Sequence, residues 1–380
     1  MMGPREIFGV ESINQLPSIL QDLGSKSIFL VTGKDSFEKL DKKINIIKLL
    51  SDFSIAHFND FKVNPRLEDI RKGIDALNRA GADAVVAIGG GSVIDVAKAI
   101  SSLAHQVSDP SEFILGTKQL TPSNIPLISI PTTAGSGSEA THFAVVYIDG
   151  KKYSLAHKSI LPHTSIIDPA LTYDLPPNIT AASGLDALSQ AIESFWSVKS
   201  TNISKKYAKD AISLILPHLE NAVCNPSPED RWALSKGAHM AGKAINISFT
   251  TACHAISYSI TTRFAVAHGF AVAITLPSMI KYNAGVHEND VQDKRGVKYV
   301  KSMMQELYTL LGSTSSDSAS QKIIGLLKKI GAPTHLSDVG ITTKTHFDNL
   351  LKQGYNPQRM QNNPRIIPQG SFLRLLRETA

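Results

Sequence analysis

Cysteine is nearly absent from this chain of 380 residues, which has only Cys224 and Cys253. Two cysteines are too few for the disulfide framework of a small secreted domain, so we expect a reducing compartment. The sequence also lacks an apolar run of the ~20 residues that a membrane span needs. Its N-terminal stretch lacks the basic and then apolar pattern of a signal peptide. These absences predict a cytoplasmic protein that does not act at a membrane.

The positive charge of the chain shows little pattern. The formal net charge is +6, yet lysine and arginine are scattered apart from short pairs such as Lys205-Lys206. Proteins that bind nucleic acid usually gather these residues into a stripe or patch, so we expect no nucleic-acid partner. A share of 42% hydrophobic and 19% charged residues is ordinary for a globular protein. The length is enough for two domains.

The N-terminal part of the chain alternates between strand and helix patterns. Short apolar runs at 26–33, 82–89 and 125–131 end in glycine- or hydroxyl-rich turns, as buried parallel strands do. Between them, 65–81 and 93–104 space their apolar residues at helical intervals. This alternation predicts an α/β domain with a parallel sheet that has helices on its faces. Ligands of such a sheet bind outside the carboxyl ends of its strands.

The pattern changes after the Pro-Pro pair at 176–177. From about residue 179 nearly every segment has helical spacing, for example 204–223, 231–245, 296–312 and 319–331. We therefore predict a nucleotide-binding α/β domain over 1–175 and an all-helical domain over 176–380, with a cleft between them. Domain interfaces are favoured places for ligand pockets.

Two glycine- and hydroxyl-rich turns follow predicted strands. GGGSVIDVAK at 89–98 opens a helix, so its backbone can approach a ligand and its helix N-terminus favours phosphate. This motif is neither GxGxxG nor a P-loop. PTTAGSGSEAT at 131–141 offers hydroxyls and backbone N–H groups. Either turn alone is compatible with a purely structural role, but two at strand ends predict a nucleotide that is held from both sides.

Four residues of the second half form a candidate metal site. Asp186 and Gln190 lie four residues apart and would leave the same face of a helix. His254 and His268 are fourteen residues apart (268 − 254 = 14), or ~21 Å along a straight helix, so the chain must reverse if both bind one ion. Gly269 and the loss of helical spacing in TRFAVAHG at 262–269 predict such a break. Spacing alone leaves a metal site and ordinary helix residues both open.

Four motifs together resemble those of the iron-containing (group III) alcohol dehydrogenases: GGGSVIDVAK, PTTAGSGSEAT, GLDALSQAIE and HGFAVAITLP. The resemblance runs from REIFGVESINQLP near the N-terminus to NNPR near the C-terminus. It implies a Rossmann-like nucleotide domain and a helical domain, an architecture shared with dehydroquinate synthase-like enzymes. It also implies one divalent metal, Fe²⁺ or Zn²⁺, in the cleft, NAD(P)H-dependent interconversion of aldehydes and alcohols, and a homodimer.

By this resemblance the metal ligands are Asp186, Gln190, His254 and His268. Gln190 departs from the family, in which most members carry histidine, and a carboxamide oxygen generally binds Fe²⁺ or Zn²⁺ more weakly than imidazole does. Tyr258 also departs, because many members have a second histidine there that is thought to relay a proton. Tyr258, together with Lys152 near the nicotinamide, is a candidate catalytic residue.

The resemblance also assigns the nucleotide-binding residues. It implies that the pyrophosphate is held by Gly89, Gly90, Gly91 and Ser92, and that Asp95 lies near the nicotinamide ribose. It also implies that the cofactor is lined by Thr132, Thr133, Ser136 and Lys152. NAD-preferring members have an aspartate after the first strand, where this chain has Gly33 followed by Lys34. Without that carboxylate a 2′-phosphate meets no repulsion and Lys34 can pair with it, which favours NADPH, whereas Asp35 favours NADH. Both cofactors stay open.

A finer resemblance concerns the substrate. The segments EATHFAVVYIDGKKYSLAHKSILP and KAINISFTTACHAISY resemble the phosphonoacetaldehyde reductase branch, which reduces phosphonoacetaldehyde to 2-hydroxyethylphosphonate. A doubly charged phosphonate needs several hydrogen-bond donors and a fixed cation. The candidates are Asn246, Ser248, Thr250, Thr251 and Arg263. These side chains are equally compatible with capping helices. Reduction of sulfoacetaldehyde to isethionate, or of a generic short-chain aldehyde, is the alternative.

Two functions outside this reaction stay open. A nucleotide-binding protein with a decayed metal site would explain Gln190, although Asp186, His254 and His268 argue against decay. A metal-dependent lyase or cyclase on the same architecture would leave the nicotinamide unchanged at the end of the reaction.

Overall fold

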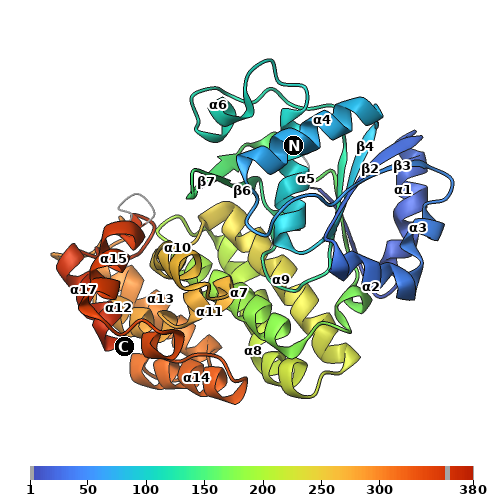
Figure 1. The fold of residues 1–380 in the computed structure, drawn as a ribbon. Coiled ribbons are helices and arrows are strands. Elements are labelled where there is room, and N and C mark those ends of the chain that lie inside the picture. The colour runs from blue at the N-terminus through green and yellow to red at the C-terminus, as the bar shows by residue number, and fades with distance from the viewer. Residues whose placement is uncertain (1–3, 356–359, 380) are drawn as a thin grey trace. The chain divides into compact units, whose positions relative to one another are not determined.

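The computed structural model describes residues 4–355 and 360–379, and the chain divides into two compact units, Met1–Asp174 and Leu175–Ala380 (Figure 1). We call them unit 1 and unit 2. Unit 1 contains a parallel sheet with helices, and the described part of unit 2 contains helices without a strand. The predicted fold class is confirmed. Within the described ranges no helix is both long and apolar enough to cross a membrane.

Six parallel strands form the sheet of unit 1. Their spatial order is β1 (Arg5–Phe8), β8 (Thr164–Ile167), β5 (Leu127–Pro131), β4 (Ala84–Gly89), β2 (Ser27–Thr32) and β3 (Ser54–Phe58). Strand β2 pairs with β3 on one side and with β4 on the other, so the winding of the chain reverses between β2 and β4. In open α/β sheets the crevice at such a switch point is where ligands bind. The strand ends that flank it here are Thr32 and Gly89.

Helices cover both faces of this sheet (Figure 1). One face packs against α4 (Leu67–Ala80), α5 (Gly91–Leu103) and α6 (Pro110–Ile114), and the other against α1 (Leu16–Asp22), α2 (Asp35–Ile44) and α3 (Ile46–Leu49). Along β2, Phe29 and Val31 belong to the first core while Ile28 and Leu30 belong to the second. Because both faces are buried, the strand reads as a continuous apolar run.

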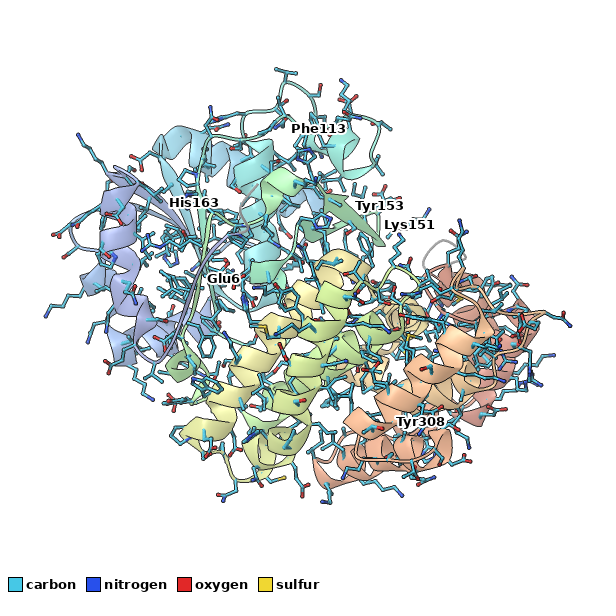
Figure 2. The ribbon with its side chains drawn as sticks, turned by 180° about the vertical axis from the view of Figure 1, so that it is seen from behind. Glu6, Phe113, Lys151, Tyr153, His163 and Tyr308 are labelled. Carbon is cyan, nitrogen blue, oxygen red and sulfur yellow. The ribbon has the colours of Figure 1, made fainter. Side chains whose placement is uncertain are left out.

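An antiparallel hairpin completes the first core of unit 1. Its strands are β6 (Phe143–Ile148) and β7 (Lys151–Ala156). Figure 2 labels Phe113 of α6 and Tyr153 of β7, which both belong to or pack against this core. Short 3-10 helices lie at Ser12–Gln15, Ser138–Ala140, Lys158–Ile160 and Pro169–Thr172 in unit 1, and at Leu336–Val339 in unit 2.

The described part of unit 2 is built from helices. They are α7 (Pro177–Trp196), α8 (Asn202–Cys224), α9 (Pro228–Ser248), α10 (Ala252–Phe264), α11 (His268–Ala273), α12 (Leu276–Ala284), α13 (Val297–Leu310), α14 (Ser316–Lys329), α15 (Lys344–Gly354) and α17 (Gln369–Glu378). Helices α8, α9 and α11 all pack against α7. Its residues Phe195 and Trp196 are fully buried. This central position gives α7 neighbours from several distant parts of the sequence.

The chain turns back between α10 and α11. Helix α10 ends at Phe264, Ala265 takes a left-handed conformation with φ of 55°, and α11 begins at His268. The turn lies in the segment 262–269, where the sequence predicted a break. A Cβ atom on Gly269 would lie 1.8 Å from the carbonyl oxygen of Ala182, so α11 packs on the backbone of α7. This contact needs a glycine.

We therefore expect Gly269→Ala to destabilise unit 2 by about 1–3 kcal/mol, because an added methyl group must push two helices apart. The two tryptophans of the chain, Trp196 and Trp232, both lie in unit 2, so tryptophan fluorescence during urea unfolding reports on that unit. Gly325→Ala in α14 is the matched control, since its Cβ would meet nothing within 4 Å. The control should be neutral or stabilising by up to about 1 kcal/mol. Equal unfolding midpoints for the two variants would contradict the packing argument.

Candidate metal centre and nucleotide-binding loops

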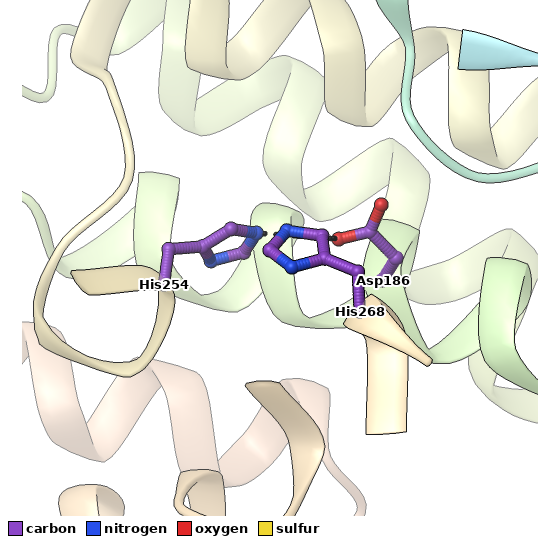
Figure 3. A group of neighbouring side chains, drawn as sticks. All are labelled: Asp186, His254 and His268. Atoms are coloured by element: carbon purple, nitrogen blue, oxygen red, sulfur yellow. Dashed lines mark hydrogen bonds and ion pairs between the residues drawn. The ribbon is translucent and has the colours of Figure 1, made fainter. Parts of the chain in front are cut away.

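Three side chains of unit 2 converge on one point. Asp186 comes from α7, His254 from the first turn of α10 and His268 from the first residue of α11 (Figure 3). One ligand atom of each lies within 4.8 Å of the other two. The Nε2 atoms of His254 and His268 are 3.3 and 3.9 Å from Oδ1 of Asp186. The fold thus brings together two histidines that are fourteen residues apart in the sequence.

Gln190 lies one turn further along α7 and is buried, with an exposed fraction of 4%. Its spacing from Asp186 puts it on the same face of the helix. A carboxylate, two imidazoles and a carboxamide offer oxygen and nitrogen donors, the kind of set that binds Fe²⁺ or Zn²⁺. The role of Gln190 as the fourth ligand stays a prediction.

Glu193 is a residue of this cluster that the sequence analysis missed. Its carboxylate pairs with Nδ1 of His254 and accepts hydrogen bonds from the start of α10. Residues 186, 190 and 193 are spaced i, i+4 and i+7, so all three lie on one face of α7. That spacing was the available signal. The sequence could not show that this face meets the N-terminus of a helix that begins at Ala252.

The electrostatics of the cluster favour a cation. Burial by itself would lower the pKa of His254, but the carboxylates of Glu193 and Asp186 outweigh burial and raise that pKa to about 10. Two nearly buried carboxylates therefore attract positive charge to the point where the ligand atoms meet. A divalent cation satisfies the same demand, so the residues present fit a metal.

His268 has two further neighbours on α10. The ring of Tyr258 stacks on that of His268 with 6.0 Å between the ring centroids, and Oγ of Ser257 lies 3.5 Å from Nδ1 of His268. Tyr258 is thus beside the cluster, where many members of the resembling family carry histidine. A phenol in this place offers a hydroxyl that both donates and accepts a hydrogen bond.

The five candidate anion-binding residues differ in their surroundings. Ser248 and Thr251 are buried, and their hydroxyls bond inside unit 2: Ser248 donates to the carbonyl of Ala244, and Thr251 donates to Glu193. Asn246 and Thr250 are half-buried, and Arg263 is exposed. The hydroxyls of Ser248 and Thr251 thus donate hydrogen bonds within unit 2, as the capping alternative expects, and their role toward an anion stays a prediction.

A strained backbone lies between Ser248 and Thr250. Phe249 has φ of 59° and ψ of 171°, a region that is essentially restricted to glycine. Two hydrogen bonds hold Ser248 at the C-terminal end of α7. The hydroxyls of Ser194 and Ser248 share one (2.7 Å), and Ser197, which follows α7, donates the other to the carbonyl of Ser248 (2.7 Å). These contacts hold the strained turn that leads into α10.

In unit 1 the two glycine-rich turns lie side by side. Gly89 pairs with Pro131 at the ends of β4 and β5, and the backbone N–H of Thr132 donates to the carbonyl of Gly89 (3.0 Å). A Cβ atom on Gly91 would lie 2.6 Å from Oγ of Ser136. Glycine at this position therefore allows the two turns to pack together. Helix α5 begins at Gly91, so its free N–H groups lie at the same place.

Asp95 and Lys98 of α5 fasten the second turn to the hairpin. Asp95 accepts hydrogen bonds from the hydroxyl of Ser138 (2.5 Å) and the N–H of Val145 (3.1 Å). The ammonium of Lys98 is fully buried and donates to the carbonyls of Thr141 (2.7 Å) and Phe143 (3.0 Å). Burial lowers the pKa of Lys98 to about 8, against the opposing charges of Asp95 and Glu139. Asp95 is thus engaged within unit 1.

The end of β2 carries the residues predicted to choose the cofactor. A Cβ atom on Gly33 would lie 2.5 Å from Oγ of Ser36, so a larger residue there requires Ser36 to move. The exposed Lys34 lies 3.9 Å from Asp60, which also pairs with Lys72 at 3.1 Å. Lys152 lies on β7 and is half-buried.

Family models match almost the whole of this chain. The model described as iron-containing alcohol dehydrogenase matches residues 4–169, and that of the C-terminal part of the Fe-containing alcohol dehydrogenase family matches 180–380. The chain belongs to the iron-containing alcohol dehydrogenase family. It is an oxidoreductase that acts on a CH–OH group or the corresponding carbonyl. The family uses NAD(H) and a divalent metal, usually iron.

Two relatives and one solved structure illustrate the range of similarity. A phosphonoacetaldehyde reductase of Streptomyces viridochromogenes is 32% identical over 80% of this chain and 77% of its own length. Long-chain-alcohol dehydrogenase 1 of Geobacillus thermodenitrificans is 29% identical over 94% of this chain and 90% of its own. The crystal structure of sulfoacetaldehyde reductase from Bifidobacterium kashiwanohense with NAD⁺ matches with a TM-score of 0.89 at 29% identity, covering 100% of this chain and 98% of that one.

We expect Gln190→His to tighten metal binding, on the order of tenfold or about 1.4 kcal/mol, because imidazole is a better donor than a carboxamide oxygen. Gln190→Ala, which removes the donor, should weaken binding. Affinity is measured by titrating metal-free protein with Zn²⁺ in competition with a chromophoric chelator. A decayed site gives a different result, namely that the histidine variant alone acquires metal.

Proposed function

We propose that this protein is a metal- and NAD(P)H-dependent reductase of a small anionic aldehyde. Phosphonoacetaldehyde is the preferred candidate substrate, and sulfoacetaldehyde is the alternative. The observation that carries the proposal is the convergence of Asp186, His254 and His268 in a member of an alcohol dehydrogenase family. The anionic substrate class is supported by a phosphonoacetaldehyde reductase and a sulfoacetaldehyde reductase among the similar proteins, at 32% and 29% identity.

The proposed reaction moves a hydride from the reduced nicotinamide to the carbonyl carbon of the aldehyde. The C=O bond becomes a C–OH group, NAD(P)H becomes NAD(P)⁺, and the carbonyl oxygen receives a proton that comes from water. Asp186, Gln190, His254 and His268 would hold a divalent metal, which would supply a Lewis acid for the carbonyl oxygen. The protein residues hold the ligands and the cofactor in place and handle the proton.

Tyr258 is the proposed proton carrier. Its ring lies parallel to that of His268, with an angle of 6° between the planes, so the phenol is fixed beside the ligand cluster. A phenol hydroxyl can donate its proton to the product oxygen and recover one from water. This chain thereby does without the second histidine of many family members. Lys152 is still proposed to lie near the nicotinamide, as the resemblance implies.

The turns of unit 1 are the proposed cofactor site. Gly89, Gly90, Gly91 and Ser92 would hold the pyrophosphate at the N-terminus of α5, where free N–H groups favour an anion. Thr132, Thr133 and Ser136 come from the neighbouring turn. At the end of β2, the positive charge of Lys34 favours NADPH. The carboxylate of Asp60 nearby partly offsets that charge, which is compatible with NADH. A homodimer stays a prediction from the resemblance.

For the substrate anion, the surroundings of the five candidate side chains favour testing three of them. Ser248 and Thr251 already use their hydroxyls inside unit 2. Asn246, Thr250 and Arg263 are at least partly accessible, and Arg263 carries the fixed charge that a phosphonate or sulfonate needs. We propose these three residues as the ones that contact the anion.

A substrate panel tests this proposal. We expect kcat/KM for phosphonoacetaldehyde or sulfoacetaldehyde to exceed that for butanal roughly tenfold or more, because charge-assisted hydrogen bonds to the anion contribute about 1.5–3 kcal/mol. The assay follows NADH and NADPH in parallel on protein of known metal content. Arg263→Ala should reduce kcat/KM for the anionic substrates and leave that for butanal nearly unchanged, while Arg263→Lys should retain part of the preference. Equal kcat/KM for all three aldehydes would indicate a generic alcohol dehydrogenase.

Metal removal tests the role of the ligand cluster. We expect a chelator to abolish turnover, and Fe²⁺ or Zn²⁺ added afterwards to restore it, since no other Lewis acid is available in the proposed reaction. Turnover is measured as oxidation of NAD(P)H, and bound metal by elemental analysis of the same samples. Cofactor binding should survive the chelator, because the proposed cofactor residues belong to unit 1. Full activity at zero metal content would exclude this mechanism.

A further inference from the structure

Glu193 lies beside the ligand cluster, and the proposed reaction assigns no role to it. It is fully buried, with an exposed fraction of 0%. Burial of a charged carboxylate is costly unless its oxygens accept hydrogen bonds. The two oxygens of Glu193 meet two different groups of atoms, and the difference between these groups has a chemical consequence.

The first oxygen, Oε1, is surrounded by donors from the start of α10. It lies 3.2 Å from the backbone N of Thr251 and 2.7 Å from its hydroxyl oxygen. It also lies 2.8 and 3.4 Å from the backbone N atoms of Cys253 and His254. Backbone N–H groups at a helix N-terminus have no acceptor within their own helix. The atom of residue 193 that faces them must therefore be an acceptor.

The second oxygen, Oε2, faces Nδ1 of His254. A carboxylate has no proton to give, so the proton of this hydrogen bond belongs to Nδ1. An imidazole that carries its proton on Nδ1 presents a lone pair on Nε2. Nε2 of His254 is the atom that lies 3.3 Å from Oδ1 of Asp186. Once a metal displaces the proton that Nε2 shares with Asp186, this lone pair is available where the other ligand atoms converge.

We propose that Glu193 is a positioning residue that selects the tautomer of His254 with Nε2 as the metal-binding atom. This inference rests on the proposed function, because it requires that the cluster binds a metal. It adds that metal affinity depends on a residue that does not touch the metal. Carboxylates that bond the far nitrogen of a histidine ligand act in this way in many metal sites.

Glu193→Gln separates this role from packing. The amide has one acceptor and one donor group, and four donors at the start of α10 compel its oxygen to face them. Its NH₂ group then faces Nδ1 of His254, which must become an acceptor, and the ring proton moves to Nε2. The variant keeps the size and the helix-capping contacts of Glu193 but turns a proton toward the metal position.

We expect Glu193→Gln to weaken Zn²⁺ binding 10–100-fold, with nearly the same circular dichroism spectrum. Binding is measured on metal-free protein in competition with a chromophoric chelator, below the melting temperature of the least stable variant. Ser194→Ala is the matched control, since it removes the hydrogen bond from Ser194 to Ser248 at the same junction. The control should lower the melting temperature and leave the Zn²⁺ affinity unchanged. An unchanged affinity in Glu193→Gln would overturn the proposal.

A second measurement uses no variant at position 193. In Zn²⁺-loaded protein with ¹⁵N-labelled histidine, NMR should show the His254 proton on Nδ1 and the metal at Nε2, with His254→Gln identifying the signals. Coordination through Nδ1 would refute the assignment even if Glu193→Gln failed to fold.

The outcomes separate this inference from the proposed function. If the unaltered protein binds no metal, the proposed function fails, and this inference fails with it. If the unaltered protein and Glu193→Gln bind Zn²⁺ equally, the function stands and the role of Glu193 is disproved.

Discussion

The contact between Glu193 of α7 and the N-terminus of α10 is the interaction on which the ligand cluster depends. A buried carboxylate needs hydrogen-bond donors, and the first turn of a helix has N–H groups without acceptors. The carboxylate accepts the hydrogen bonds that these N–H groups donate, and the contact is buried away from water. Because α10 begins at this carboxylate, His254 in its first turn faces Asp186. The strained backbone of Phe249 is held in the same junction.

Close backbone approach is the second constraint, and it operates in both units. At Gly269 helix α11 lies directly on the carbonyl of Ala182, which brings His268 to the cluster. At Gly91 the first glycine-rich turn lies against Ser136 of the second turn. In each place a methyl group would collide with its neighbour. The glycines of these motifs therefore shape the protein itself, in addition to any contact with a ligand.

Much of the fold could be read from the sequence because local patterns carry it. The run IFLV at 28–31 is apolar throughout because both faces of its sheet are covered, and the buried residues of α4 recur at helical intervals. The break in TRFAVAHG was visible as a loss of periodicity and as Gly269. The role of Glu193 was hidden because its partner helix begins 59 residues later (252 − 193 = 59). Ser248 and Thr251 were compatible with capping a helix or with binding an anion, and only the tertiary structure shows which groups their hydroxyls meet.

The sequence by itself determined the type and order of the elements, the two-part organisation and, through its motifs, the family. These properties depend on residues that are neighbours in the chain, where periodicity and turn chemistry act. The tertiary structure alone decided which candidate ligand side chains lie together. Asp186, His254 and His268 become one site only when three helices pack together, and Glu193 becomes the partner of His254 only when α10 begins beside it. Contacts between distant segments follow from packing and burial, which local spacing does not record.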